Sequence, residues 1–241
     1  MSNLVAGISV SLSTADDFSE GNIAAGVIKA IFESPVNLKP VRYGLFSGDE
    51  IIERAEDVVR VLVGQERKSE AGGVVLSASK DCEYQLQWDR ANNLLSYVGG
   101  FLLSNAYRRN PKILHDYLSF IKDLAVVCNV AYGEIRSMSC DGWDTPFNLM
   151  MRLPEIPNVS IYGRPYVEMF GRDKIENAPF HQVEQIANDI YWLQSTADVT
   201  EMVSGSTREK IRGYFGENAY MVGKKWRYKD GIHPEWNKYM S

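Results

Sequence analysis

Three closely spaced segments with alternating apolar side chains, all between residues 73 and 103, constrain the fold most strongly. In the middle segment, residues 83–89, the order Tyr84-Gln85-Leu86-Gln87-Trp88 puts an apolar side chain at every second position. This is the period of a β-strand with one buried face. Residues 73–79 and 93–103 are predicted to be strands on either side, and Asn92-Asn93 suits a hairpin turn. Because short turns join antiparallel neighbours, the sequence predicts an antiparallel sheet here.

The remaining chain mixes helical and strand periods. Apolar residues at helical spacing predict helices, and alternating or short apolar runs predict strands. The helices are predicted at 20–32, 47–62, 111–125, 164–177 and 207–215, and the strands at 5–13, 41–46, 126–136, 159–162, 180–186 and 190–194. Since the strands gather in neighbouring pairs, we expect an α+β fold, with a mainly antiparallel sheet and helices packed on one face. The chain forms a single domain, 1–241, or two closely packed halves at about 1–108 and 109–241.

Composition and charge exclude several classes of protein. The chain of 241 residues is 45% hydrophobic, which is too apolar for a disordered protein. Its 26 Lys and Arg residues against 31 Asp and Glu residues give a formal net charge of −5. A nucleic-acid partner is not expected, because such proteins need a basic stripe to neutralise phosphates. Residues 224–241, with five basic and two acidic residues, are either a solvated tail or a small basic patch for nucleic acid.

The cysteines and the apolar runs indicate the compartment. Cys82, Cys128 and Cys140 are far apart and odd in number, so we expect free, mostly buried thiols. Residues 1–7 lack a basic region before a long apolar run, so no secretory signal is expected. No segment approaches the ~20 apolar residues that span a membrane. We therefore expect a cytoplasmic protein without a membrane partner.

No motif for catalysis or cofactor binding is present. The sequence contains no GxxxxGK[ST] loop, no GxGxxG after a strand, no GxSxG elbow and no HExxH. The histidines, His115, His181 and His233, are widely separated and have no partner in the sequence that indicates a role in catalysis or metal binding. We therefore expect no catalytic residue, no metal and no cofactor.

An irregular acidic and aromatic segment is the first candidate for a partner-binding site. Residues 137–158 show no period, and long loops inside compact domains are often functional. Asp141 and Asp144 flank Trp143, a pattern typical of an apolar anchor surrounded by charge. The alternative is that Trp143 packs into its own core and the aspartates cap turns. Weaker candidates are the three carboxylates expected in the first turn of the 47–62 helix, Asp49, Glu50 and Glu53.

Residues 152–179 carry a resemblance to a known class of proteins. The stretch YGRPYVEMFGR, residues 162–172, and the tail Lys225-Trp226-Arg227-Tyr228-Lys229-Asp230-Gly231 resemble bacterial immunity proteins. These proteins guard against secreted antibacterial toxins, particularly type VI secretion effectors. Within the stretch itself, Tyr162, Tyr166 and Phe170 are expected in the core, and Pro165 at a helix start. The stretch is therefore interpreted as a fold signature and not as the toxin-binding site.

The resemblance implies a function without turnover. The protein is expected to bind and neutralise a cognate toxin, encoded by the adjacent gene, through a stoichiometric complex. Net acidity is compatible with this, since complementary charge speeds encounter with a basic toxin. Two alternatives stay open: a cytoplasmic Asp/Glu-based hydrolase of unrecognised type, and a regulatory module that binds another intracellular protein.

Overall fold

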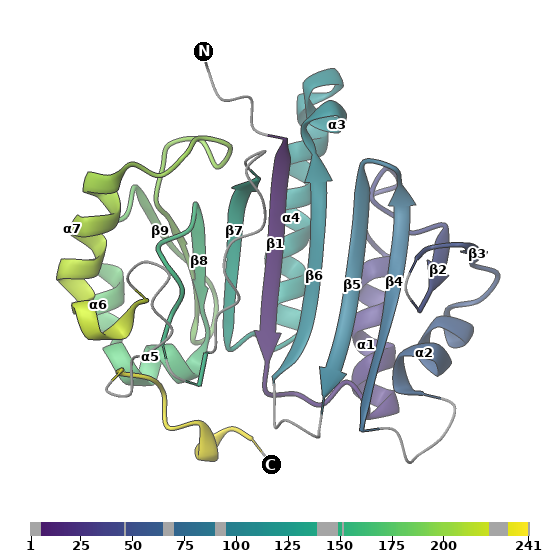
Figure 1. Cartoon of the computed structure of the whole chain (residues 1–241), viewed down its shortest axis with the longest axis horizontal. Helices are drawn as coiled ribbons and strands as arrows, with labels where there is room; N and C mark the ends of the chain where they lie inside the picture. Colours follow the sequence, from purple (N-terminus) through teal and green to yellow (C-terminus); the bar gives the residue numbers. More distant parts are fainter. Residues whose placement is uncertain are drawn as a thin grey trace. The chain divides into compact units, whose positions relative to one another are not determined.

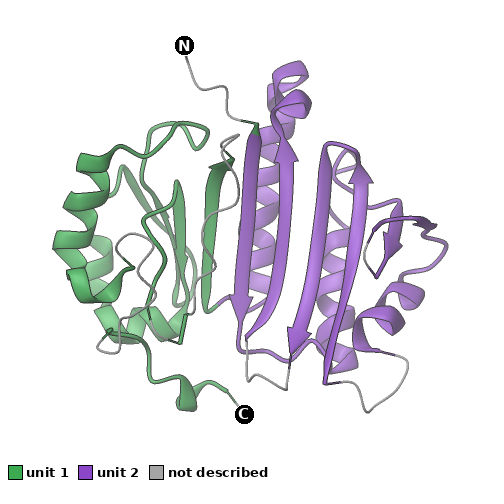
Figure 2. Ribbon diagram, in the orientation of Figure 1, with its two compact units in different colours: residues 1–6, 131–241 green, residues 7–130 purple. Residues whose placement is uncertain are grey.

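The computed structural model describes residues 6–45, 47–64, 70–89, 95–138, 149–150, 152–221 and 231–240. Two compact units make up the chain: unit 2 contains residues 7–130, and unit 1 contains residues 1–6 and 131–241 (Figure 2). Each unit combines helices with an antiparallel sheet, so the predicted α+β class is confirmed.

The sheet of unit 2 contains the alternating segments that were predicted to form neighbouring strands. Its order is β3-β2-β4-β5-β6-β1, with every pair antiparallel. In β5 the predicted alternation is present, because Tyr84, Leu86 and Trp88 are buried. The strand bounds are β1 Gly7–Thr14, β2 Arg42–Gly44, β3 Glu50–Ile51, β4 Ala71–Ser79, β5 Cys82–Asp89 and β6 Ser96–Leu103.

Two helices cover one face of this sheet. Helices α1 (Gly21–Phe32) and α4 (Pro111–Val127) both lie behind the strands of unit 2 in Figure 1. Helix α4 begins where predicted, because the Asn110 side chain accepts from the Lys112 amide and Pro111 fits the first turn. Its buried side chains are Tyr117, Phe120, Ile121, Leu124 and Ala125. The shorter helices of the unit are α2 (Ala55–Val63) and α3 (Ser104–Arg109).

The helix predicted from residue 47 begins eight residues later than expected. Glu50 and Ile51 form β3 instead, opposite Tyr43 and Arg42 of β2. The pairing continues in the hydrogen bond from the Ile52 amide to the Val41 carbonyl, at 3.1 Å. Backbone groups committed to a neighbouring strand are not available for a helical turn. The first turn of α2 therefore carries Glu56 and Asp57, and the prediction that Asp49, Glu50 and Glu53 lie there is wrong.

Unit 1 has a four-stranded sheet in the order β7-β8-β10-β9. The predicted turn at Asn188-Asp189 is confirmed, and Asp189 adopts φ +60° between two antiparallel strands. The strands are β7 Tyr132–Met138, β8 Val159–Tyr162, β9 Gln182–Ala187 and β10 Ile190–Gln194. The helices are α5 Arg164–Phe170, α6 Arg172–Glu176 and α7 Gly205–Phe215, with the 3₁₀ turns η1 Glu217–Ala219 and η2 Trp236–Lys238.

The core of unit 1 is aromatic and is centred on Tyr162. Its ring lies 5.6 Å from the Tyr166 ring, 5.7 Å from that of Phe170 and 5.9 Å from that of Phe215, measured between centroids. The Tyr162 and Tyr220 hydroxyls are hydrogen-bonded at 2.8 Å. Aromatic pairs at these separations stabilise a core beyond the area they bury. The expectation that Tyr162 and Tyr166 are buried in the core is confirmed, whereas Phe170 contacts them from a half-buried position.

The helix predicted over 164–177 is two helices separated at Gly171. This residue has φ +85°, a conformation that side chains with a Cβ rarely adopt. Its amide donates to the Val167 carbonyl at 2.9 Å, which ends α5 before α6 begins.

Replacement of Gly171 by alanine should destabilise the fold through the backbone alone. No atom lies within 4 Å of the position a Cβ would take, so the expected cost of ~1–2 kcal/mol comes from positive φ. Gly26 of α1 is the matched control, because it too has open space around it but is helical. Gly26→Ala should stabilise by ~0.5–1 kcal/mol. Urea unfolding of both variants measures the difference, and equal shifts would contradict the role assigned to Gly171.

The thiols of Cys82 and Cys128 should be nearly inert in the native protein. Both are free and buried, while Cys140 lies outside the described residues. Burial raises the pKa of Cys82 to about 11, although its hydrogen bond to the Tyr84 hydroxyl opposes the shift; burial likewise raises the pKa of Cys128. Because the thiolate is the nucleophile, alkylation of Cys82 at pH 8 should be about 100-fold slower than in denaturant. Peptide-resolved mass spectrometry of the unreduced protein checks this, and rapid native labelling of Cys82 would contradict it.

Candidate functional site

The predicted partner-binding residues fall into two groups. Asp141, Trp143 and Asp144 lie outside the described residues. Asp49, Glu50 and Glu53 belong to unit 2, where they are exposed on a hairpin at one edge of the sheet. We call this surface the β2–β3 tip, defined as residues 41–45 and 47–53. The tip contains those predicted site residues that lie within the described part of the chain.

Large apolar side chains are exposed at the same tip. Val41 is 56% exposed, Leu45 62% and Ile51 70%. Single exposed apolar residues are common on protein surfaces, but a group next to polar residues marks interaction sites. Ile51 lies within the segment predicted as the 47–62 helix, but it belongs to β3 and is exposed there. The tip therefore combines apolar and acidic groups on one hairpin.

Backbone hydrogen bonds hold the tip to the rest of unit 2. The Val41 amide donates to the Ser77 carbonyl of β4 at 2.9 Å, and β2 pairs with β3 on its other side. Gly44 is required at this position, because a Cβ there would collide with the Ser47 carbonyl oxygen. The side chains of the tip are thus presented on paired strands and a constrained turn.

The acidic groups at the tip form no ion pair within the described chain, although two arginines lie beside them. The Arg42 guanidinium donates to the Asp49 carbonyl at 3.5 Å, and the charge of Arg54 interacts with that of Glu53. The Ser47 hydroxyl donates to the Asp49 carboxylate, and Tyr43 hydrogen-bonds to Glu50, which raises the pKa of the Tyr43 hydroxyl. No ion pair among the described residues engages Asp49, Glu50 or Glu53. Unpaired exposed carboxylates create a negative potential that attracts basic surfaces. The arrangement is suited to binding a protein with a basic, partly apolar surface.

The described residues offer little to other kinds of chemistry. Among them, no group of three or more His, Cys, Asp or Glu side chains is placed to hold a metal ion. None of the helices within the described ranges has the length and apolar character needed to cross a bilayer.

A buried ionic network in unit 1 was not identified from the sequence. Glu134 and Arg136 of β7 lie two residues apart on one face, and the Arg136 Nε donates to Glu134 at 2.8 Å. The Tyr132 hydroxyl also donates to Glu134, at 3.0 Å, and the Arg136 Nη2 donates to the Glu155 carbonyl at 2.6 Å. Arg208 of α7 pairs with the Glu155 carboxylate at 3.1 Å. This network joins β7, residues 152–158 and α7. The sequence feature that could have indicated it is the pair of opposite charges two residues apart in a predicted strand.

The comparisons with known proteins show the fold. No family model matches the chain, and no match is found among the curated proteins. Among solved structures, the chain is similar to the T6SS protein PA0821 of Pseudomonas aeruginosa, with a TM-score of 0.56 and 9% sequence identity. The likeness covers 87% of this chain and 75% of that one. At this identity the two proteins share an arrangement of helices and strands.

Removal of the Glu134 charge should destabilise unit 1 strongly. Glu134→Gln removes the carboxylate charge that pairs with the mostly buried Arg136 guanidinium, and breaking a buried pair costs ~3–5 kcal/mol. Glu235→Gln is the control, because it breaks an exposed pair with Lys238 that contributes ~0–1 kcal/mol. Urea unfolding of both variants gives the comparison, and a loss at Glu134 no larger than at Glu235 would show that the buried pair is not needed for stability.

Proposed function

We propose that this protein is an immunity protein of a type VI secretion system, which binds and neutralises a cognate antibacterial toxin by forming a stoichiometric complex. The observation that carries the proposal is the β2–β3 tip, a hairpin that combines exposed Val41, Leu45 and Ile51 with exposed carboxylates that form no ion pair within the described residues. The resemblance of residues 162–172 to immunity proteins and the fold shared with a T6SS protein support it.

The tip has the two properties that a protein inhibitor of a basic toxin needs. Covering its apolar side chains removes them from water, which is the main favourable term in association. The carboxylates at positions 49, 50 and 53 select a partner with basic groups and speed its approach. Neither property involves turnover, so inhibition requires one molecule of this protein for each toxin.

Co-expression with the product of the adjacent gene tests the proposed function directly. If that product is the cognate toxin, its expression alone should arrest growth and co-expression should restore growth. The two proteins should elute together in a fixed ratio, and the purified chain alone should show no hydrolase activity. Continued arrest in the presence of folded protein would overturn the proposal.

Substitutions at the tip should weaken toxin binding without unfolding the chain. Ile51→Asp places a charge at a tip position that is 70% exposed and apolar, and we expect about tenfold weaker binding, or about 1.4 kcal/mol. The control is Met202→Asp, at a residue of unit 1 that is 55% exposed. Calorimetry gives the affinities, and melting temperatures exclude unfolding.

The charges of the tip should act mainly on the association rate. Reversing Asp49, Glu50 and Glu53 to lysine should slow association most strongly at low salt. Trp143→Ala and the Asp141→Ala/Asp144→Ala pair are measured in the same assay. If only these variants weaken binding, the loop that contains them is the interface and the tip is not.

A further inference from the structure

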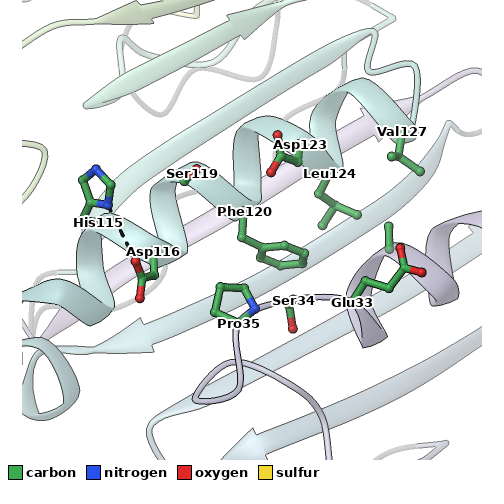
Figure 3. A pocket seen from close by; sticks show the side chains of 11 residues that line it. Glu33, Ser34, Pro35, His115, Asp116, Ser119, Phe120, Asp123, Leu124 and Val127 are labelled. Carbon is green, nitrogen blue, oxygen red and sulfur yellow. Dashed lines mark ion pairs between the residues drawn. The ribbon is translucent and has the colours of Figure 1, made fainter.

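Unit 2 contains a second surface feature, a groove between the C-terminal end of α1 and one face of α4 (Figure 3). Its volume is about 310 Å³. Glu33 and Pro35 line one side, and Asp116 and Asp123 of α4 line the other. Phe120 and Leu124, both buried, form the apolar part of its lining. The groove is distinct from the β2–β3 tip, since none of its residues belongs to that hairpin.

Helix α4 presents an alternation of acidic and apolar side chains to the groove. Asp116, Phe120, Asp123 and Val127 follow one another at intervals of four, three and four residues, which places them on one face. Val127 is 48% exposed at the C-terminal end of this stripe. An amphipathic helix or an extended segment that docks in a groove is recognised by anchors at such intervals.

The charge of the groove is negative. Glu33 pairs with Lys29 at 3.8 Å and Asp116 with Lys112 at 3.1 Å, but both lysine side chains are about three-quarters exposed and neither lines the groove. His115, which does line the groove, has its Nδ1 3.7 Å from the Asp116 carboxylate and carries a charge only when protonated (Figure 3). Such exposed pairs contribute little and are easily exchanged. Within the described chain, the carboxylate of Asp123 has neither an ion pair nor a hydrogen bond.

A buried hydroxyl in the groove lining also lacks a partner. Ser34 is 7% exposed, and its Oγ makes no hydrogen bond to any described residue. This Oγ has almost no accessible surface, so it lies beneath the lining and is not open to the groove. An occupant of the groove is therefore recognised by the carboxylates and the apolar side chains of the lining, and not by this hydroxyl.

The spacing of the carboxylates favours a peptide over a metal ion. Asp116 and Asp123 are seven residues apart on α4, which corresponds to about 10.5 Å along the axis. Hard cations need oxygen ligands at about 2.0–2.6 Å, so these two carboxylates do not converge on one ion. Two lysine or arginine side chains of one bound peptide match this spacing, one beside each aspartate. Apolar side chains of the peptide between these two cations contact Phe120.

We propose that the groove between α1 and α4 binds a basic, amphipathic segment of a protein partner. A lysine or arginine of the segment pairs with Asp123, and a second cation lies near Asp116. Apolar side chains of the segment pack on Phe120 and Val127. The proposal goes beyond toxin neutralisation through the tip, because it requires a different surface and makes no use of the tip residues.

A synthetic peptide tests the groove directly. The probe is a fluorescein-labelled 14-residue helical peptide with lysines seven residues apart and leucines between them. Its binding to the full chain is measured by fluorescence anisotropy at low and high salt. Backbone amide shifts in NMR spectra locate the site, and a peptide with glutamates in place of lysines is the charge control. We expect binding of the lysine peptide, weakened by salt, with shifts confined to α1 and α4.

Three variants separate the groove from general charge attraction. Asp123→Lys should weaken binding about tenfold, which is about 1.4 kcal/mol. Ser119→Trp fills the groove from an exposed position of its lining and should weaken binding similarly without a change of charge. Glu209→Lys, at an exposed position of α7 in unit 1, makes the same change of net charge and should have less than about twofold effect. Circular dichroism confirms that each variant is folded.

The outcomes decide between the groove and its alternatives. Equal losses for Asp123→Lys and Glu209→Lys would show attraction to the whole acidic protein and overturn the proposal. If Asp123→Lys weakens binding of the lysine peptide but Ser119→Trp leaves it unchanged, the peptide does not occupy the groove. That result also overturns the proposal. Failure of the wild type to bind the lysine peptide would do the same. Rescue of growth in the toxin assay does not depend on these results, so the two proposals fail separately.

Discussion

Tyr84 is the side chain on which the arrangement of unit 2 depends most. It projects from β5 and is fully buried, with its ring 5.8 Å from the Phe120 ring of α4. Its hydroxyl donates to the Leu38 carbonyl at 3.1 Å, and the Leu38 amide in turn donates to the Pro35 carbonyl at 2.7 Å. One residue of the sheet thereby joins α4 to the segment after α1. These contacts fix the distance between the two sides of the groove.

The sequence patterns correctly predicted those elements whose backbone conformation depends mainly on residues close in the sequence. Strand β8 has the predicted bounds, and the hairpin of β9 and β10 turns at Asn188-Asp189 as expected. The error at residues 50 and 51 arose because Ile51 and Ile52 continue the helical spacing of the apolar residues in α2, while the backbone of Glu50 and Ile51 pairs with β2. The break at Gly171 was missed because the apolar period of α5 continues through α6, and only a positive φ separates them.

The candidate site was only partly predictable for a related reason. The acidic residues of the tip were selected from their charge, which needs no tertiary information. The exposure of Ile51 depends on the pairing of β3, and the groove depends on residues that lie about 80 positions apart in the sequence. The Glu134–Arg136 pair shows the opposite case, since strand spacing places both on one face but only packing buries them. Burial of polar groups is set by tertiary contacts that periodicity does not encode.

The shortness of β3 has a consequence for how a partner is recognised. It is the terminal strand in unit 2, and it offers only two residues of backbone. Long, flat, apolar edges recruit further strands indiscriminately, whereas an edge of this length supports almost none of the hydrogen-bonded ladder. If the tip binds a partner as proposed, recognition there relies on side chains and not on the peptide backbone. Side chains on an exposed hairpin can change without altering the core, so specificity at this surface is free to diverge between relatives while the fold is retained.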